Sequence, residues 1–171
     1  MVRSLSFIHL FIILAVGYIG GALLFREIPS EAVERWIAFY DARVVEGREA
    51  GVIRPIGALV SFYIVAYVFA RIRQTRPLVL FTGALKSVFF GLASSYLLGS
   101  GMKMLDYTVW WFPFQFASCF LFLLYCAVLR PPYFMQSTIG KRRNPRALPI
   151  LLFLSACVLL GEMAIYYWIL R

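Results

Sequence analysis

Five apolar stretches, each close to the length that crosses a bilayer, constrain this chain more than any other feature. They cover about residues 5–25, 52–70, 78–100, 107–129 and 148–170. The hydrocarbon core of a bilayer is about 30 Å thick, and an α-helix of about 20 residues spans it. Apolar residues make up 62% of the 171-residue chain and charged residues only 15%, which is outside the usual range of soluble domains. We therefore predict an all-α integral membrane protein with a single membrane domain, residues 1–171, built as a five-transmembrane-helix bundle.

The first stretch raises a separate question, because an apolar run near an N-terminus is also typical of a signal peptide. Residues 5–25 are longer than the usual apolar region of a signal peptide, and no A-x-A cleavage pattern closes them. We therefore interpret this stretch as an uncleaved first span.

The third stretch carries small residues at every fourth position. On a helix such residues form one inclined ridge, along which a neighbouring backbone can approach closely. Lipid tails are as apolar as leucine, so helices in a bilayer associate through close packing at small residues. The first stretch has a GxxxG pattern of its own. We predict that these residues pack helices together: Gly17, Gly21, Gly83, Ser87, Gly91, Ser95 and Gly99.

The segment between the first two spans differs in composition from the rest of the chain. It holds six of the eight acidic residues, between Glu27 and Glu49. Ser30 is suited to cap a helix, and an apolar stripe at helical spacing follows it, formed by Val33, Trp36, Ile37, Tyr40 and Val44. We predict an amphipathic helix over about residues 30–47 that lies in the extracytoplasmic membrane interface. This helix is either a simple connector or a docking surface for an extracytoplasmic partner, with Trp36 and Tyr40 as its contact residues.

Basic residues and tryptophans indicate the orientation of the bundle. The turn after the second span holds Arg71, Arg73 and Arg76, and the loop after the fourth holds Arg130, Lys141, Arg142, Arg143 and Arg146, without any acid. Short basic loops stay in the cytoplasm, which predicts a cytoplasmic N-terminus. All four tryptophans then fall on the outer side, as an aromatic belt would: Trp36, Trp110, Trp111 and Trp168. Lys141, Arg142, Arg143 and Arg146 are also candidates for contact with lipid headgroups.

Two charged residues, Lys86 and Glu162, lie inside the apolar stretches. They fall about 12 Å and about 18 Å into spans that run in the same direction, at 1.5 Å per residue. An unpaired charge at the bilayer centre is unfavourable by roughly 3 kcal/mol, so we predict that Lys86 and Glu162 form an intramembrane ion pair. The alternative is that Lys86 extends to the cytoplasmic headgroups and Glu162 is protonated. Gln115 lies two residues after Pro113, and it could bond to the carbonyl that the proline leaves free or across to another helix; substrate binding is the alternative.

No pattern of a catalytic, cofactor or metal site is found in the sequence. Paired carboxylates, a nucleophile elbow, a glycine-rich phosphate loop and metal-ligand spacing are all absent, and the chain has one histidine, His9. The three cysteines, Cys119, Cys126 and Cys157, lie in apolar runs and are typical of small buried side chains. We expect no enzymatic activity, no cofactor and no nucleic-acid partner.

Three stretches resemble the stage II sporulation protein M family. The stretch LVLFTGALKSVFFGLASSYLLGSG is similar to the family's central span, DYTVWWFPFQFASCFLFL to the next, and RRNPRALPILLFLSACVLLGEMAIYYWIL to the basic lead into a last span that contains a glutamate. The chain departs from the family pattern at Lys86, where the central span is usually apolar, and it lacks the proline that often follows the last span.

The resemblance implies a non-enzymatic scaffold. In spore-forming bacteria the namesake protein holds peptidoglycan-degrading partners at the septal membrane during engulfment, a step of sporulation. By this resemblance the chain would lie in a bacterial cell membrane and would anchor or recruit extracytoplasmic, cell-wall-remodelling proteins. A small transporter, or the membrane subunit of a transport system, is the alternative; a solute path would require polar residues on more than one helix face, and the spans contain few.

Overall fold

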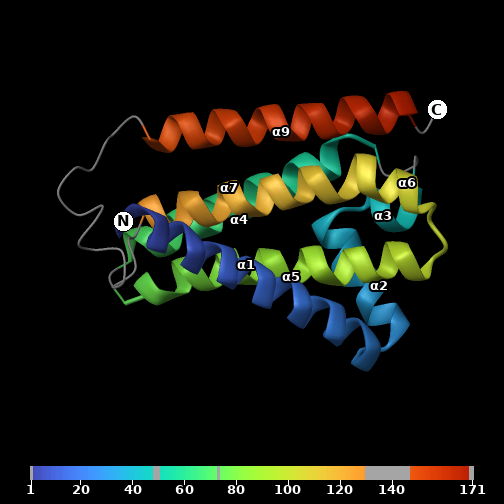
Figure 1. Ribbon diagram of the computed structural model, residues 1–171, viewed down its shortest axis with the longest axis horizontal. Coiled ribbons are helices and arrows are strands. Elements are labelled where there is room, and N and C mark those ends of the chain that lie inside the picture. Colours follow the sequence, from blue (N-terminus) through green and yellow to red (C-terminus); the bar gives the residue numbers. More distant parts are fainter. Residues whose placement is uncertain (1, 48–50, 73, 130–146, 170–171) are drawn as a thin grey trace.

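Five long helices run along one axis in the computed structural model, which describes residues 2–47, 51–72, 74–129 and 147–169 (Figure 1). They are α1 (Val2–Glu27), α4 (Ile53–Arg71), α5 (Arg76–Gly99), α7 (Phe112–Leu129) and α9 (Ala147–Ile169). α7 is extended at its start by α6 (Met104–Asp106) and by a π-helical turn, η2 (Tyr107–Trp111). All five spans are long and apolar enough to cross a membrane, and no strand occurs among the described residues. The predicted all-α, multi-pass architecture is confirmed.

α5 is the central helix of the bundle. Within its most apolar window 56% of the residues are buried, against 22% for α1 and 17% for α9. α1, α4 and α7 pack around α5, whereas α9 packs on the far side of α7. The most buried helix is therefore also the one with the ladder of small residues.

α1 and α5 meet along a contact that we call the glycine seam, formed by Gly17, Gly21 and Gly91. A Cβ atom at Gly91 would overlap the carbonyl oxygen of Tyr18, and one at Gly21 would overlap the carbonyl oxygen of Val88. At Gly17 it would lie 2.7 Å from Cβ of Ser87. Only glycine permits such an approach of two backbones, so the seam fixes how α1 lies on α5.

The other residues of the predicted ridge have different surroundings. Gly83 faces α7, where a Cβ would lie 2.6 Å from Cδ2 of Leu123. Ser95 is only half-buried, and Gly99 is exposed beside the ring of Phe25. The ridge therefore contacts two neighbouring helices, α1 along most of its length and α7 near its start.

The fourth span begins irregularly because of Pro113. Proline has no N–H group and its ring displaces the carbonyl one turn earlier, which disturbs the α-helical ladder. The N–H of Phe112 instead donates to the carbonyl of Tyr107, five residues back. Trp110 and Trp111 lie in this turn and are almost fully buried, at 1% and 0% exposure. Their predicted place in an aromatic belt is therefore wrong; the π turn directs both indoles into the bundle.

The segment between α1 and α4 forms two helices, α2 (Ser30–Tyr40) and α3 (Arg43–Glu46), where one helix over 30–47 was predicted. The break is at Asp41, whose backbone is extended (φ −154°, ψ 102°) and whose side chain accepts a hydrogen bond from the N–H of Arg43. The predicted stripe is buried against α4 and α5, except for Trp36. The apolar face of this segment is therefore covered by protein.

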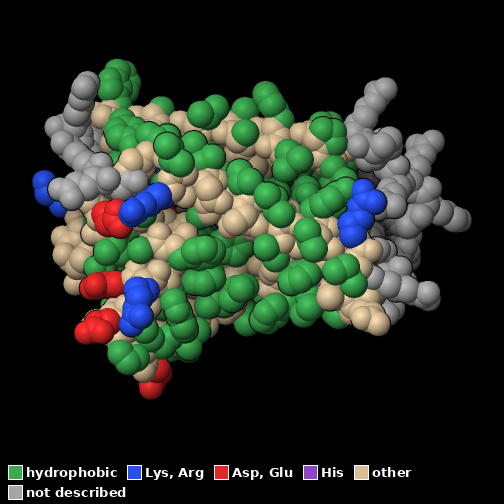
Figure 2. All heavy atoms as spheres, turned by 180° about the vertical axis from the view of Figure 1, so that it is seen from behind, with side chains coloured by type: hydrophobic (Ala, Val, Ile, Leu, Met, Phe, Trp, Pro, Cys, Tyr) green, Lys and Arg blue, Asp and Glu red, His purple; other side chains and the backbone are tan. Residues whose placement is uncertain are grey.

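The surface of the bundle has an apolar middle and charged ends (Figure 2). On the face shown, hydrophobic side chains extend along the bundle, and the acidic side chains gather at one end. α1 begins at the same end as the α4–α5 turn, and α9 ends at the opposite end, beside α3 and α6 (Figure 1). This arrangement fits a multi-pass membrane protein with an odd number of spans.

Candidate functional site

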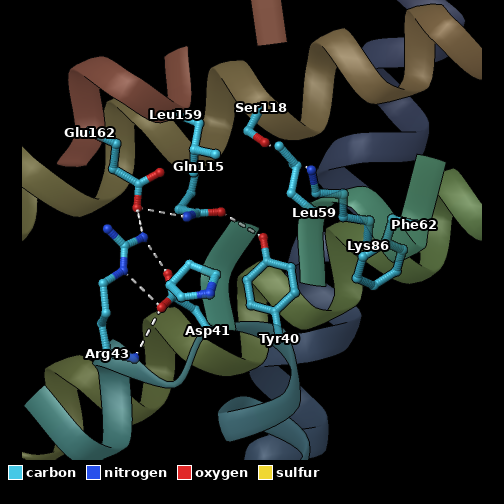
Figure 3. Close-up of a pocket in the computed structure, with 11 residues that line it drawn as sticks. Tyr40, Asp41, Arg43, Leu59, Phe62, Lys86, Gln115, Ser118, Leu159 and Glu162 are labelled. Atoms are coloured by element: carbon cyan, nitrogen blue, oxygen red, sulfur yellow. Dashed lines mark hydrogen bonds and ion pairs between the residues drawn. The ribbon is translucent and has the colours of Figure 1, made fainter. Parts of the chain in front are cut away.

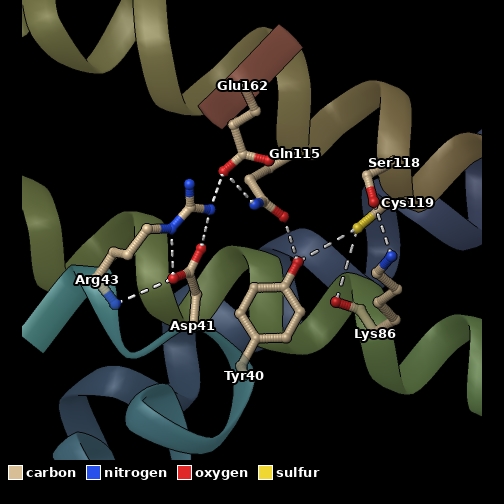
Figure 4. A network of polar contacts seen from close by, with 8 residues as sticks. All are labelled: Tyr40, Asp41, Arg43, Lys86, Gln115, Ser118, Cys119 and Glu162. Atoms are coloured by element: carbon tan, nitrogen blue, oxygen red, sulfur yellow. Dashed lines mark hydrogen bonds and ion pairs between the residues drawn. The ribbon is translucent and has the colours of Figure 1, made fainter. Parts of the chain in front are cut away.

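A polar network lies inside the bundle where the α2–α3 segment meets α5, α7 and α9 (Figure 4). All its members are buried, and they come from four separate stretches of the chain. They are Tyr40, Asp41, Arg43, Lys86, Gln115, Ser118, Cys119 and Glu162. Most of them line a cavity of about 20 Å³, which has room for about one water molecule (Figure 3).

Arg43 is the residue that joins the outer segment to the last span. Its Nε donates to Oδ1 of Asp41 at 2.9 Å, and its Nη2 donates both to Oδ2 of Asp41 at 2.6 Å and to Oε1 of Glu162. Burial by itself would lower the pKa of the Arg43 guanidinium. The hydrogen bonds that Arg43 donates to Asp41 and the negative charges of Glu162 and Asp41 outweigh that effect and raise the pKa above its ordinary value. Arg43 is therefore a permanent cation between two carboxylates.

Two aromatic rings complete the surroundings of Arg43. The Cζ atom of its guanidinium lies 5.4 Å from the ring centroid of Tyr166 and 5.8 Å from that of Trp110. Both distances allow cation–π attraction, which is strongest where water is excluded. The Nη1 atom has no hydrogen-bond partner among the described residues, and the ring faces offer it a weaker acceptor.

Gln115 connects Glu162 to α2. Its Nε2 donates to Oε1 of Glu162 at 3.1 Å, and its Oε1 accepts a hydrogen bond from the hydroxyl of Tyr40 at 2.7 Å. Of the predicted roles of Gln115, bonding across to another helix is the one observed. Burial raises the pKa of the Tyr40 hydroxyl, which keeps it protonated as a donor. Tyr40 thereby fixes the end of α2 to α7.

Lys86 reaches the network from α5, and its partner differs from the predicted one. Nζ of Lys86 donates to Oγ of Ser118 at 2.8 Å and lies 5.2 Å from the ring centroid of Phe122. None of the ion pairs among the described residues includes Lys86, and Glu162 is paired with Arg43. The predicted Lys86–Glu162 pair is therefore wrong in its contacts, although both side chains line the same cavity. Lys86 and Glu162 lie at similar depths in their helices, but similar depth does not ensure that the two side chains face each other.

The thiol of Cys119 links the part of the network around Tyr40 to the part around Lys86. Sγ of Cys119 is 3.8 Å from the Tyr40 hydroxyl and donates to the carbonyl of Lys86, also at 3.8 Å. Cys126 is buried as well, whereas Cys157 is exposed on α9. Counted formally, the network contains two cations and two carboxylates, so their charges balance.

The residues predicted to dock a partner separate in the structure. Trp36 is 48% exposed, whereas Tyr40 is 6% exposed and bonded to Gln115. Tyr40 is therefore unavailable to a partner, because helix α2 turns it inward. The predicted headgroup contacts Lys141, Arg142, Arg143 and Arg146 lie outside the described residues.

Asp41 and Arg43 are the charged members of the network that the sequence analysis does not single out. The sequence pattern places both in a segment at the membrane surface, where a charge needs no partner. One signal was available: the two charges stand between apolar neighbours in FYDARVV. A charged pair within an apolar segment resembles a buried site more than a solvated one.

The network holds segments of the chain together through balanced charges, and it leaves little free space. Its contacts attach the α2–α3 segment to the spans. Comparisons of the chain with protein-family models, with curated proteins and with solved structures find no match.

Proposed function

We propose that this protein is a non-enzymatic scaffold of the bacterial cell membrane, with a cytoplasmic N-terminus, that anchors extracytoplasmic proteins at its outer end. The observation that carries the proposal is the attachment of α2 and α3 to the bundle by the buried pairs of Arg43 with Asp41 and Glu162. A surface that is already held in place loses less entropy when a partner binds. The α2–α3 segment is such a surface.

The outward face of α2 supplies the contact residues. Trp36 and Phe39 are 48% and 60% exposed, and Glu31, Glu34 and Arg35 are exposed beside them. Exposed aromatic side chains bordered by charges are typical of protein interfaces. The partner class that we propose, peptidoglycan-degrading proteins active during engulfment in sporulation, follows from the resemblance to the stage II sporulation protein M family.

Co-purification from cells tests the proposal. Peptidoglycan-degrading activity that co-purifies with the tagged chain should fall at least about tenfold in Trp36→Ala, as expected for a central interface tryptophan. Trp168→Ala is the matched control, because Trp168 is 85% exposed on α9 and lies off the proposed surface. Equal activity with both variants would contradict the docking role of α2.

The orientation is tested by labelling in intact cells. Glu31→Cys and Gln74→Cys place single thiols at exposed positions near opposite ends of the bundle, in a chain whose own cysteines are replaced by serine. With a cytoplasmic N-terminus, an impermeant thiol reagent labels position 31 and spares position 74. The reverse pattern would place α2 in the cytoplasm and exclude extracytoplasmic partners.

A membrane subunit of a transport system is the second candidate, and the buried Lys86 beside a polar cavity favours it. The volume of about 20 Å³ supports the scaffold instead, since a solute larger than water does not fit. Ion or solute flux through reconstituted vesicles that is lost in Lys86→Met would favour transport. The scaffold predicts no flux that depends on Lys86.

A further inference from the structure

An apolar groove, separate from the polar network, runs between α4 and α9 over the surface of α7. Its cavity volume is about 420 Å³. The floor is buried and includes Tyr63, Tyr125 and Ser155, and the rims are exposed aliphatic side chains such as Val60, Ile64 and Leu152. The groove exists because α9 packs mainly on α7 and meets α4 through the hydroxyls of Tyr63 and Ser155, 2.5 Å apart.

The groove lies over the middle of α4 (Ile53–Arg71), and its length is close to the depth of one leaflet of a bilayer. On α4 its lining extends from Ile56 to Tyr67, which is about 16 Å at 1.5 Å per residue. Half of a hydrocarbon core about 30 Å thick is about 15 Å. An acyl chain of one leaflet therefore has the length needed to lie along the groove.

The two mouths of the groove differ in charge. Near Ile56, the guanidinium of Arg54 is paired with Glu46 at 2.5 Å. Arg71 lies one turn beyond Tyr67, at the other mouth, is exposed, and has no carboxylate partner among the described residues. Its Nε and Nη2 both donate to the hydroxyl of Tyr67, and its Cζ lies 5.1 Å from that ring. Tyr67 thus holds an uncompensated cation beside the open end.

The side chains that line the groove favour a lipid chain over a helix as its occupant. Helices associate in membranes through small residues that let backbones approach. Here the rims are bulky and Ala156 is the one small apolar residue that lines the groove. The Tyr63 and Ser155 hydroxyls satisfy each other, so the floor offers a polar ligand little to bind. A flexible hydrocarbon chain fits such a surface better than a second helix does.

We propose that the α4–α9 groove binds one acyl chain of an anionic glycerophospholipid, with the phosphate of its headgroup on Arg71. The lipid belongs to the leaflet at the α4–α5 end of the bundle. Its bound chain seals the gap between two helices that barely touch, and its headgroup neutralises Arg71.

Native mass spectrometry of the full-length protein in detergent, titrated with phosphatidylglycerol or phosphatidylethanolamine, tests the site. The wild type should retain phosphatidylglycerol preferentially. Arg71→Gln should lower that preference about fivefold, as expected for one basic residue at a membrane surface. Arg54→Gln, at the other end of the same helix, should leave it unchanged.

A second variant tests the part of the site that binds the acyl chain. Ala156→Phe fills the groove and should lower retention of both lipids severalfold. Leu160→Phe enlarges a 67% exposed side chain on α9 outside the groove and should have no effect. Unchanged retention in Ala156→Phe would overturn the proposal, and so would loss of an oligomer in that variant, which would identify a helix as the occupant. An unaltered lipid preference in Arg71→Gln would overturn the headgroup assignment.

Discussion

The glycine seam and the polar network hold the same bundle together by opposite means. At the seam, α1 and α5 approach until Gly91 lies against the backbone of Tyr18, and shape alone decides the fit. In the network, Arg43 lies between two carboxylates, and charge balance decides which segments meet. The seam positions a span on a span, whereas the network fixes a non-spanning segment to the spans. Different physical interactions therefore hold the spans to one another and hold the α2–α3 segment to the spans.

Among the variants that test this comparison, one that removes Arg43 should lower the free energy of unfolding the most. Arg43→Met leaves Asp41 and Glu162 buried without a cation, and stranding buried charges typically lowers the free energy of unfolding by about 3–5 kcal/mol. Unfolding titrations in detergent measure it. Arg35→Met, which removes an exposed arginine from neighbouring α2, should change stability by less than about 0.5 kcal/mol. Similar values for the two variants would mean that Arg43 is solvated in the folded protein.

Gly91→Leu tests the seam and should rank second. The new side chain would overlap the carbonyl of Tyr18, and overpacking at such a contact lowers stability by about 1–3 kcal/mol or prevents assembly. Gly20→Leu is the matched control, because a Cβ at Gly20 has no neighbour within 4 Å. Unfolding in detergent and elution as a single species distinguish them. A stable, well-behaved Gly91→Leu protein would contradict the close approach of α1 and α5.

Tyr40→Phe removes one hydrogen bond from the network and keeps its charges. The loss of the bond to Gln115 should lower the free energy of unfolding by about 1 kcal/mol. Limited proteolysis between α2 and α4 should also become faster, because the end of α2 is less firmly attached. An unchanged cleavage rate would show that Arg43 alone holds the segment.

Lys86→Met should have the smallest effect. Lys86 bonds to Ser118 and to no carboxylate among the described residues, and methionine has a similar length without a charge to bury. Stability should change by less than about 1 kcal/mol, in either direction. A loss as large as that of Arg43→Met would show that the stability of the network depends on Lys86 as much as on the ion pairs of Arg43.

The sequence predicted the parts of this molecule that depend on local pattern. Spans follow from the length of each apolar run, and the contacts of Gly17, Gly21 and Gly91 follow from small residues at a spacing of four. Such patterns are complete within about 20 residues.

The network could not be predicted in the same way, because Arg43 and Glu162 are 119 residues apart. Depth along two helices suggested Lys86 as the partner of Glu162, but depth gives no information about helix rotation. The position of α2 and α3 was also missed, since an apolar stripe is compatible with burial against either lipid or protein. Asp41, which ends α2 and orients Arg43, shows how one local break sets a distant contact.

Paired double-mutant cycles in detergent test the central claim, that Arg43 and not Lys86 is the ionic partner of Glu162. The first cycle combines Arg43→Met with Glu162→Gln, and the second combines Lys86→Met with Glu162→Gln. Residues in direct ionic contact show coupling energies of about 0.5–3 kcal/mol, so we expect a coupling of about 1–3 kcal/mol in the first cycle and less than about 0.5 kcal/mol in the second. Strong coupling between Lys86 and Glu162, with additive effects of Arg43 and Glu162, would contradict the account.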